Sequence, residues 1–204
     1  MERRIIFATG NENKMKEIRM ILAGLQMPVY SMKEVGTDIK IVEDGASFEE
    51  NAEIKARAVS RFHPNDIVLA DDSGLEIDYL DKAPGIYSAR FAGEDTSYDI
   101  KNRILLDKLE GVPEEKRTAR FVCAIAAAFP EGEVKTVRAT IEGRIAHEIL
   151  GENGFGYDPI FYYPGTDCTT SEMTSEQKNE LSHRGKALRE MRKVLERYEE
   201  NQNA

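Results

Sequence analysis

The chain has 204 residues, of which 41% are hydrophobic and 32% are charged, and its formal net charge is −9. That balance predicts a soluble globular protein, and the acidic surface disfavours broad nucleic-acid binding because it repels a phosphate backbone. No apolar run approaches membrane-spanning length, the N-terminal apolar run is too short for a signal peptide, and the two cysteines lack metal-type spacing. We expect a cytoplasmic protein without membrane contacts, in which locally gathered Lys and Arg could still bind a small anion.

The chain begins with a predicted strand and helix. The β-rich segment 4–8 precedes turn residues at 9–13. A helix follows, and its apolar side chains recur at i, i+3, i+4 and i+7, namely Ile18, Ile21, Leu22 and Leu25. A short second strand can begin at 28–30.

A second helix follows an acidic loop at 39–46. Ser47 fits the N-cap and Glu50 the third helical position of a capping box, and we predict a helix that ends at about Phe62.

An acidic tetrapeptide, Asp71-Asp72-Ser73-Gly74, comes directly after a predicted short buried strand at 67–70. Apolar and acidic residues then alternate over 75–80, which predicts a half-buried strand. Thr96 could cap the next helix, and we expect that helix to end at Gly111 and Pro113.

The second half of the chain predicts a long hairpin, a glycine-rich loop and a last helix. The expected segments are strands at 119–129 and 134–145, a loop at 151–159, a strand at 160–163 and a helix from about Ser182. Together with the alternation in the first half, this order predicts an α/β fold with a long mixed sheet and flanking helices. We predict one domain over residues 1–204 with two lobes and no separable linker, and a central ligand cleft.

The strand-to-helix junction at 7–14 is a candidate phosphate site. Backbone N–H groups at a helix N-terminus attract phosphate, and Lys14 can add a cation. The glycine spacing and the Lys-Ser/Thr pair of a P-loop are missing, so a plain turn with a surface lysine is the alternative.

Asp71 and Asp72 are candidates for metal binding or catalysis. Two carboxylates after a buried strand are costly to leave unpaired, and Mg²⁺ commonly joins one or two carboxylates to substrate phosphates. Because successive strand side chains point in different directions, only one of the pair should face a ligand directly. The alternative is an Asp-rich turn.

Two later segments add aromatic and basic groups. In the loop 154–159, Phe155 or Tyr157 could stack on a base and Asp158 could accept hydrogen bonds from ring N–H groups, although a tight turn with core aromatics also fits. Lys178 and the segment 182–186 gather basic residues near a helix start, where they oppose the helix dipole. A solvated face is the alternative there.

Six segments in order resemble the inosine triphosphate pyrophosphatase family, whose members act on non-canonical purine nucleotides. The matching segments are Thr9-Gly10-Asn11-Glu12-Asn13-Lys14, Phe48-Glu49-Glu50-Asn51-Ala52, Ala70-Asp71-Asp72-Ser73-Gly74-Leu75, Pro84-Gly85-Ile86-Tyr87-Ser88-Ala89-Arg90, Gly154-Phe155-Gly156-Tyr157-Asp158-Pro159-Ile160-Phe161 and Ser182-His183-Arg184-Gly185-Lys186-Ala187.

The resemblance implies Mg²⁺-dependent hydrolysis of ITP, dITP and XTP to the monophosphate and pyrophosphate, by a two-lobed homodimer. It implies that Asp72 is the proton acceptor and a metal ligand, and that Glu43 is a second metal ligand. The residues that it implies for substrate binding are Thr9, Gly10, Asn11, Glu12, Asn13, Lys14, Ser73, Phe155, Gly156, Tyr157, Asp158, Lys178, His183 and Arg184. Lys55 and Arg90 are plausible further phosphate contacts.

On this hypothesis Asp72 prepares a water that attacks the α-phosphorus, while Asp158 and Arg184 recognise N1–H and O6 of the purine.

Two alternative functions remain. A Maf-like pyrophosphatase would act on dTTP, UTP or modified pyrimidines, and a nucleotide sensor would bind ITP without releasing pyrophosphate. The carboxylate pair argues against the sensor, because a protein that only binds gains little from carboxylates near phosphates.

Overall fold

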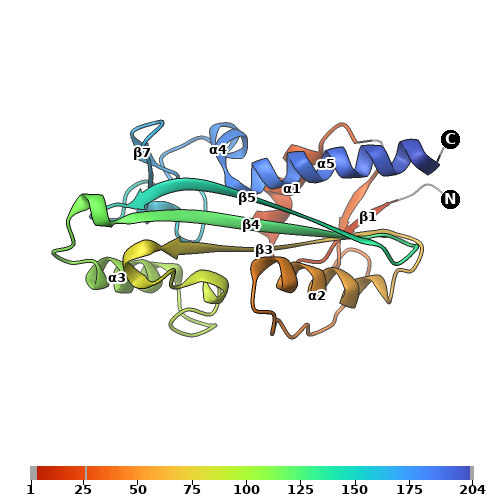
Figure 1. Ribbon diagram of the computed structural model, residues 1–204, viewed down its shortest axis with the longest axis horizontal. Helices are drawn as coiled ribbons and strands as arrows, with labels where there is room; N and C mark the ends of the chain where they lie inside the picture. Colours follow the sequence, from red (N-terminus) through yellow and green to blue (C-terminus); the bar gives the residue numbers. More distant parts are fainter. Residues whose placement is uncertain (1–3, 26, 203–204) are drawn as a thin grey trace. The chain divides into compact units, whose positions relative to one another are not determined.

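A computed structural model describes residues 4–25 and 27–202 of the chain (Figure 1). Within them, seven strands form one sheet in the order β2-β1-β3-β4-β5-β6-β7. The strands are β1 Ile5–Phe7, β2 Val29–Ser31, β3 Ile67–Ile77, β4 Thr118–Ala128, β5 Val134–Ile145, β6 Phe161–Tyr163 and β7 Cys168–Thr169. The α-helices are α1 Glu12–Leu22, α2 Phe48–Ser60, α3 Tyr98–Lys108, α4 Ser175–Leu181 and α5 His183–Gln202.

Residue contacts divide the chain into two compact units. The first unit comprises residues 1–72, 123–139 and 184–204, and the second comprises residues 73–122 and 140–183. Three of the four boundaries fall inside β3, β4 and β5, so each of these strands contributes residues to both units, and the fourth follows His183, the first residue of α5. The predicted α/β class with a mixed sheet and flanking helices is confirmed.

In the first unit, helices cover both faces of the sheet. Strand β1 pairs in parallel with β2 and β3. Apolar residues of α1 and α5 join Ile5, Phe7, Ile67 and Leu69 in one buried cluster, and α2 lies on the opposite face (Figure 1). Odd-numbered positions of β3 therefore face α1 and α5, and even-numbered positions face α2.

Strand β3 differs from the sequence-based prediction. The sequence predicted a short strand, an acidic turn and a second strand, but one strand continues from Ile67 to Ile77 through Asp71 and Asp72. Both carboxylates are buried, at 2% and 8% exposure for the whole residues, and each has cationic partners. The strand continues because those partners offset the cost of burying charge.

In the first unit, polar side chains cap the starts of α1 and α2. Asn11 accepts hydrogen bonds from the backbone N–H groups of residues 13 and 14 at the start of α1. Ser47 caps α2 by accepting from the N–H of Glu50, as predicted, whereas the Glu50 carboxylate accepts from the N–H of Ala46. The helix ends at Ser60, two residues before the predicted end.

In the second unit, β6 pairs antiparallel with β5 and β7. Its core combines side chains of β3, α3, β4 and β5, among them Leu75, Leu105, Phe121 and Ile141. The hairpin strands β4 and β5 lie within one residue of the predicted ranges. The sequence reasoning missed α4 and β7.

The cap of α3 also differs from the prediction. Ser97, not Thr96, accepts from a backbone N–H at the helix start, while the Thr96 hydroxyl donates to the carbonyl of Ala92. Among the described residues, no helix is both long enough and apolar enough to cross a membrane.

Candidate active site

Asp71 lies at the centre of a buried ion network in the first unit. Its Oδ2 is 3.0 Å from Lys14 Nζ and 3.3 Å from Arg184 Nη2. The Arg184 guanidinium also donates to Glu17 Oε2 at 2.5 Å. Because the side chains of Asp71 and Arg184 are 1% and 3% exposed, this network is shielded from solvent. It joins α1, β3 and α5 through charged hydrogen bonds.

The network keeps Asp71 ionised. Burial alone would raise the pKa of the Asp71 carboxyl, but the charges of Lys14, Arg184 and Lys55 outweigh burial and hold that pKa far below its usual range. Burial likewise opposes the charge of Arg184, and Asp71 and Glu17 raise its pKa above the usual value. Asp71 is therefore a fixed negative charge that positions two cations.

Asp72 points to the opposite face of the sheet and meets α2. Its Oδ1 accepts from Lys55 Nζ at 3.1 Å, and its Oδ2 accepts from Asn51 Nδ2 at 3.3 Å. Lys55 Nζ also donates to Glu43 Oε2 at 2.9 Å. Burial raises the pKa of Asp72, Lys55 partly offsets the rise, and Glu43 adds to it. A carboxyl with a raised pKa is a better proton acceptor than an ordinary aspartate.

Asp72 and Glu43 form a donor set that fits a hard divalent cation. Each lies within 3.1 Å of the single Lys55 ammonium, so two carboxylates are already directed at one positive charge. Mg²⁺ commonly takes one or two carboxylates and completes its shell with water and phosphate oxygens. In residues 4–25 and 27–202, no group of three or more His, Cys, Asp or Glu side chains could hold a metal ion.

The predicted phosphate loop is held by its own side chains. Thr9 Oγ1 accepts from the N–H of Asn11 at 3.1 Å. Asn11 Oδ1 accepts from the N–H groups of Asn13 and Lys14 at 3.0 and 3.2 Å, so these two amides are already bonded. Glu12 and Asn13 are exposed, and a side chain added at Gly10 would meet nothing within 4 Å. Lys14 Nζ is the member of this loop that reaches the Asp71 network.

The glycine-rich loop of the second unit is organised by Asp158. The buried Asp158 carboxylate accepts from Lys178 Nζ at 2.7 Å, from the N–H of Phe155 at 2.8 Å and from Thr170 Oγ1 at 2.8 Å. Gly154 has φ +75°, and a Cβ there would lie 2.3 Å from Asp158 Oδ2. The loop can therefore close onto Asp158 only with glycine at this position.

Aromatic residues in and near this loop differ in accessibility. Lys178 Nζ lies 4.7 Å from the ring centroid of Phe155, which is half-buried. Tyr157 is buried, and its hydroxyl donates to the carbonyl of Ser88 at 2.7 Å, so it packs as a core residue. The carbonyl of Gly156 accepts from Asn102. Phe155 is thus the aromatic residue of the loop best suited to stack on a planar ligand.

The remaining predicted residues are placed as follows. Ser73 follows Asp72 in β3 and is half-buried. His183 is buried and stacks on Phe121, with ring centroids 4.8 Å apart. The Arg90 guanidinium lies 5.4 Å from the Tyr87 ring centroid.

Sequence reasoning missed Asn51 and Glu17 and did not commit to Lys55. For Lys55 a signal existed, because a lysine shares one helix side with Ala52, Ala56 and Val59. Glu17 gave no local signal, because its partner Arg184 is 167 positions away in the sequence.

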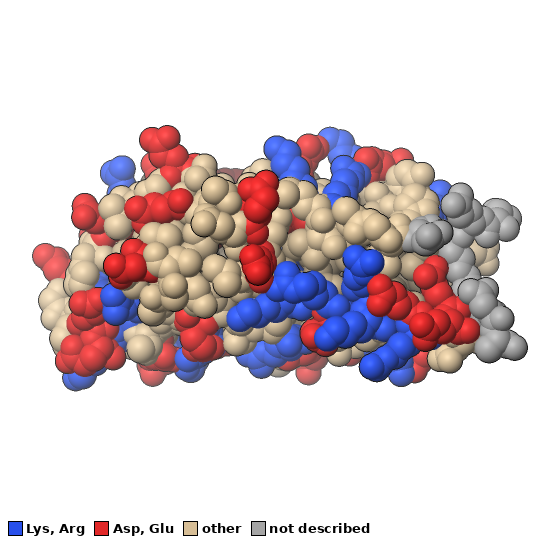
Figure 2. All heavy atoms as spheres, turned by 90° about the horizontal axis from the view of Figure 1, so that it is seen from above, with Lys and Arg blue, Asp and Glu red and all other residues tan. Residues whose placement is uncertain are grey.

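Basic side chains gather locally although the net charge is −9. Figure 2 looks onto the face that carries α5, where Lys and Arg form a band between acidic residues. Such gathering is the condition under which an acidic protein can attract a small anion.

Known sequences match this chain over nearly its whole length. The sequence model of the Ham1 family matches residues 5–194. A dITP/XTP pyrophosphatase of Exiguobacterium sibiricum is 48% identical over 192 residues, covering 94% of this chain and 96% of the relative. One of Caldanaerobacter subterraneus is 49% identical over 199 residues, covering 97% and 99%.

A solved structure shares the fold as well as the sequence. The Staphylococcus aureus Ham1 protein is 41% identical, with a TM-score of 0.85 over 95% of this chain and 98% of that one. Sequence and structure therefore agree that the chain belongs to the Ham1 family.

Proposed function

We propose that this protein hydrolyses non-canonical purine nucleoside triphosphates, namely ITP, dITP and XTP, to the monophosphate and pyrophosphate. The observation that carries the proposal is the placement of Asp72, whose buried carboxylate contacts Lys55 at 3.1 Å beside Glu43. Relatives named dITP/XTP pyrophosphatase support the substrate class. The activity removes aberrant purines from the nucleotide pool.

Asp72 acts as the proton acceptor in this proposal. A water loses its proton to Asp72 as its oxygen bonds to the α-phosphorus, and the α–β anhydride bond breaks to release pyrophosphate. Asp72 and Glu43 would hold Mg²⁺, which when bound neutralises phosphate charge and acts as a Lewis acid. Lys55 keeps the two carboxylates together, and its ammonium provides a nearby positive charge for the phosphates.

Lys14 stabilises the charge of the leaving pyrophosphate. Asp71 holds the Lys14 ammonium at 3.0 Å, and Arg184 is held by Asp71 and Glu17 in the same network. Fixed cations cost little reorganisation when charge develops during the reaction. We therefore assign Arg184 to holding Asp71 in place, rather than to the base. The backbone of Thr9–Lys14 and the Ser73 side chain supply polar contacts to the substrate.

The Asp158–Lys178 pair recognises the base in this proposal. A 6-oxo purine offers N1–H as a donor and O6 as an acceptor, which match a carboxylate and an ammonium, while Phe155 supplies a stacking surface. Adenine presents the opposite pattern, so ATP would leave buried polar groups unpaired. GTP shares N1–H and O6, so its rejection requires exclusion of the 2-amino group. Gly156, Tyr157 and His183 shape this region by packing.

A panel of nucleotides tests the function. ITP, dITP, XTP, GTP, ATP, dTTP and UTP are incubated with the protein, with Mg²⁺ or with a chelator, and the monophosphate and pyrophosphate are quantified. We expect pyrophosphate from ITP, dITP and XTP at rates well above those from the other nucleotides, and none with the chelator. A preference for pyrimidines, release of inorganic phosphate instead of pyrophosphate, or binding of ITP without turnover would overturn the proposal.

We also propose a cytoplasmic homodimer. The resemblance to the inosine triphosphate pyrophosphatase family supports the dimer, and several large apolar side chains of the second unit are exposed, including Tyr79, Tyr87 and Ile100 at 51%, 60% and 51%. Sedimentation equilibrium should give twice the chain mass of 23.0 kDa. A species of one chain mass at micromolar concentration would contradict the dimer.

A further inference from the structure

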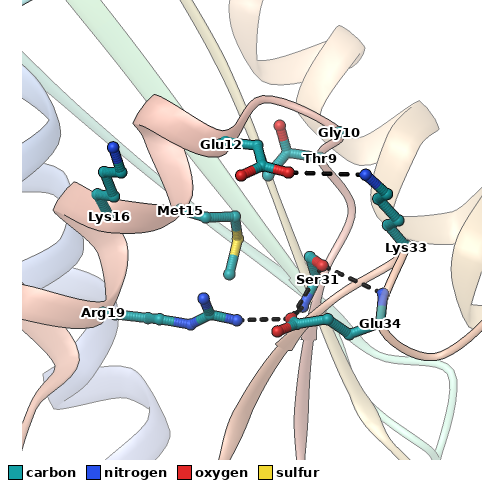
Figure 3. A pocket seen from close by; sticks show the side chains of 9 residues that line it. All are labelled: Thr9, Gly10, Glu12, Met15, Lys16, Arg19, Ser31, Lys33 and Glu34. Atoms are coloured by element: carbon teal, nitrogen blue, oxygen red, sulfur yellow. Dashed lines mark hydrogen bonds and ion pairs between the residues drawn. The ribbon is translucent and has the colours of Figure 1, made fainter.

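A pocket of about 410 Å³ lies beside α1 in the first unit (Figure 3), and the lining residues that the structure describes include no member of the Asp71 or Asp72 networks. Its walls come from the loop after β1, from α1, and from the end of β2 with the turn that follows. The lining residues are Thr9, Gly10, Glu12, Met15, Lys16, Arg19, Ser31, Lys33 and Glu34. Three of them are cations and two are carboxylates, so the lining has a net positive charge in an otherwise acidic protein.

Arg19 is a pre-positioned cation in this pocket. Its Nη2 donates to Glu34 Oε2 at 2.5 Å, and Figure 3 shows its guanidinium directed toward Glu34 across the pocket. The N–H and hydroxyl of Ser31 donate to the same carboxylate oxygen at 2.7 and 2.9 Å. The Ser31 bonds and Arg19 lower the pKa of Glu34, so this anchor stays ionised. Because a guanidinium has five N–H donors, Arg19 keeps donors for a ligand.

Lys16 and Lys33 are cations that a ligand can recruit. Within residues 4–25 and 27–202, Lys16 has no ion pair, and its side chain stands at the pocket edge (Figure 3). Lys33 Nζ lies 3.6 Å from Glu12 Oε1, with side-chain exposures of 80% and 79%. Such an exposed pair contributes little to stability, so an anion can displace Glu12 from Lys33 at small cost.

The pocket borders the loop assigned to the substrate phosphates. Thr9 and Gly10 belong both to its lining and to that loop. The space beside Gly10 is open, because a Cβ there would meet nothing within 4 Å. None of the lining residues that the structure describes is aromatic, so they offer a purine no stacking surface. Its chemistry favours a compact inorganic polyanion over a nucleotide.

We propose that this pocket is a second anion site that binds inorganic pyrophosphate through Arg19, Lys16 and Lys33. Identifying the ligand as the reaction product rests on the proposed function, whereas the binding itself does not. Pyrophosphate released near Lys14 would meet these three cations across the Thr9–Gly10 loop. The site therefore gives the enzyme a place to hold its product outside the catalytic network.

Isothermal titration of pyrophosphate into the full-length protein, without divalent metal, tests the site. We expect two binding events per chain. Lys14→Ala should remove one, and the double variant Lys16→Ala/Lys33→Ala should weaken the other by about tenfold or more, because it deletes two charge-assisted contacts. Glu12→Gln should tighten that same event, because it removes a carboxylate that competes for Lys33.

A matched control removes two lysines elsewhere in the same unit. Lys135 and Lys193 are exposed and pair with Glu133 and Glu190, so Lys135→Ala/Lys193→Ala lowers the charge equally without touching the pocket. A general charge effect would weaken binding equally in both double variants and would overturn the proposal. A single binding event in the wild type, or unchanged binding in Lys16→Ala/Lys33→Ala, would also overturn it.

The same variants separate this site from the proposed function. Because Lys16 and Lys33 lie outside the assigned catalytic residues, Lys16→Ala/Lys33→Ala should keep the wild-type kcat for ITP and the wild-type unfolding midpoint. If ITP is hydrolysed but the second event does not depend on these lysines, the site fails and the function stands. If ITP is not hydrolysed but the second event is lost in the variant, the function fails and the site stands.

Discussion

At the scale of single residues, Asp71 and Asp72 have different surroundings, because a strand directs neighbouring side chains to opposite faces of the sheet. Asp71 faces Lys14 and Arg184, which hold its pKa far below the usual value. Asp72 faces Lys55 and Glu43, and burial raises its pKa. One carboxylate is a permanent charge, and the other is suited to accept a proton.

Asp71→Asn should destabilise the protein, because Lys14 and Arg184 lose a buried partner whose side chain is 1% exposed. Removing one member of a buried ion pair costs about 3–5 kcal/mol. The folded-state pKa of Asp71 is lowered, so its stabilising contribution is present above the unfolded-state pKa of about 3.9 and is lost as the pH falls toward the folded-state value. Urea unfolding at pH 7 and at about pH 3 should show a smaller difference from the wild type at the lower pH. An equal difference at both values would contradict the assignment.

The raised pKa of Asp72 has a consequence for activity. Because Asp72 must be ionised to accept a proton, acidification should reduce kcat/KM for ITP at a pH above the ordinary aspartate pKa of about 3.9. The pH profile of kcat/KM measures this directly. Activity that persists to the ordinary aspartate pKa would show that Asp72 is not the titrating base.

At the scale of elements, the glycine-rich loop before β6 depends on a backbone that only glycine adopts easily. Gly154 has φ +75° and lies against Asp158, which in turn holds Lys178 beside Phe155. Backbone conformation, not side-chain chemistry at residue 154, thus sets the geometry of the proposed base-binding residues.

Gly154→Ala should raise KM for ITP more than it lowers kcat, because it displaces Asp158 without touching Asp72. Gly132→Ala is the matched control, since Gly132 also has a positive φ, +87°, but a Cβ there would meet nothing within 4 Å. Both variants should lose about 1 kcal/mol or more from backbone strain, and Gly154→Ala should lose more. Steady-state kinetics and thermal unfolding measure the two effects. Equal KM values in the two variants would argue against a role for this loop in substrate binding.

Local sequence signals predicted most helices and strands. They failed where contacts between residues distant in the sequence determine the secondary structure. Alternation and turn chemistry placed β4, β5 and the Ser47 cap of α2 well. The continuity of β3 could not be predicted, because the cations that pair with its two aspartates come from α1, α2 and α5. The two-residue strand β7 and the seven-residue helix α4 are too short for periodicity to indicate them.

The candidate site, too, could be predicted only in part from the sequence. Motif resemblance named Asp72, Lys14 and Asp158 as site residues, whose roles stay predictions, but it did not name the charged groups that they contact. Glu17 of α1 pairs with Arg184 of α5, and Asn51 of α2 pairs with Asp72 of β3, so these contacts exist only once the fold brings the elements together.

At the scale of the whole molecule, three strands join the two compact units. Because β3, β4 and β5 each continue from one unit into the other, neither unit contains these strands in full. We therefore propose one cooperative domain with two lobes and expect a single unfolding transition. Calorimetry and urea titrations followed by circular dichroism and by tyrosine fluorescence should give coincident transitions. Two separate transitions would show independent domains.

Single-turnover hydrolysis of ITP with Asp72→Asn measures whether Asp72 accepts the proton from the attacking water. The matched control is Asp107→Asn, an exposed substitution on α3. We predict that Asp72→Asn keeps a wild-type fold and still binds ITP, but releases pyrophosphate about 10²–10⁴-fold more slowly, while Asp107→Asn is unchanged. Near-normal pyrophosphate release by Asp72→Asn would show that Asp72 is not the proton acceptor.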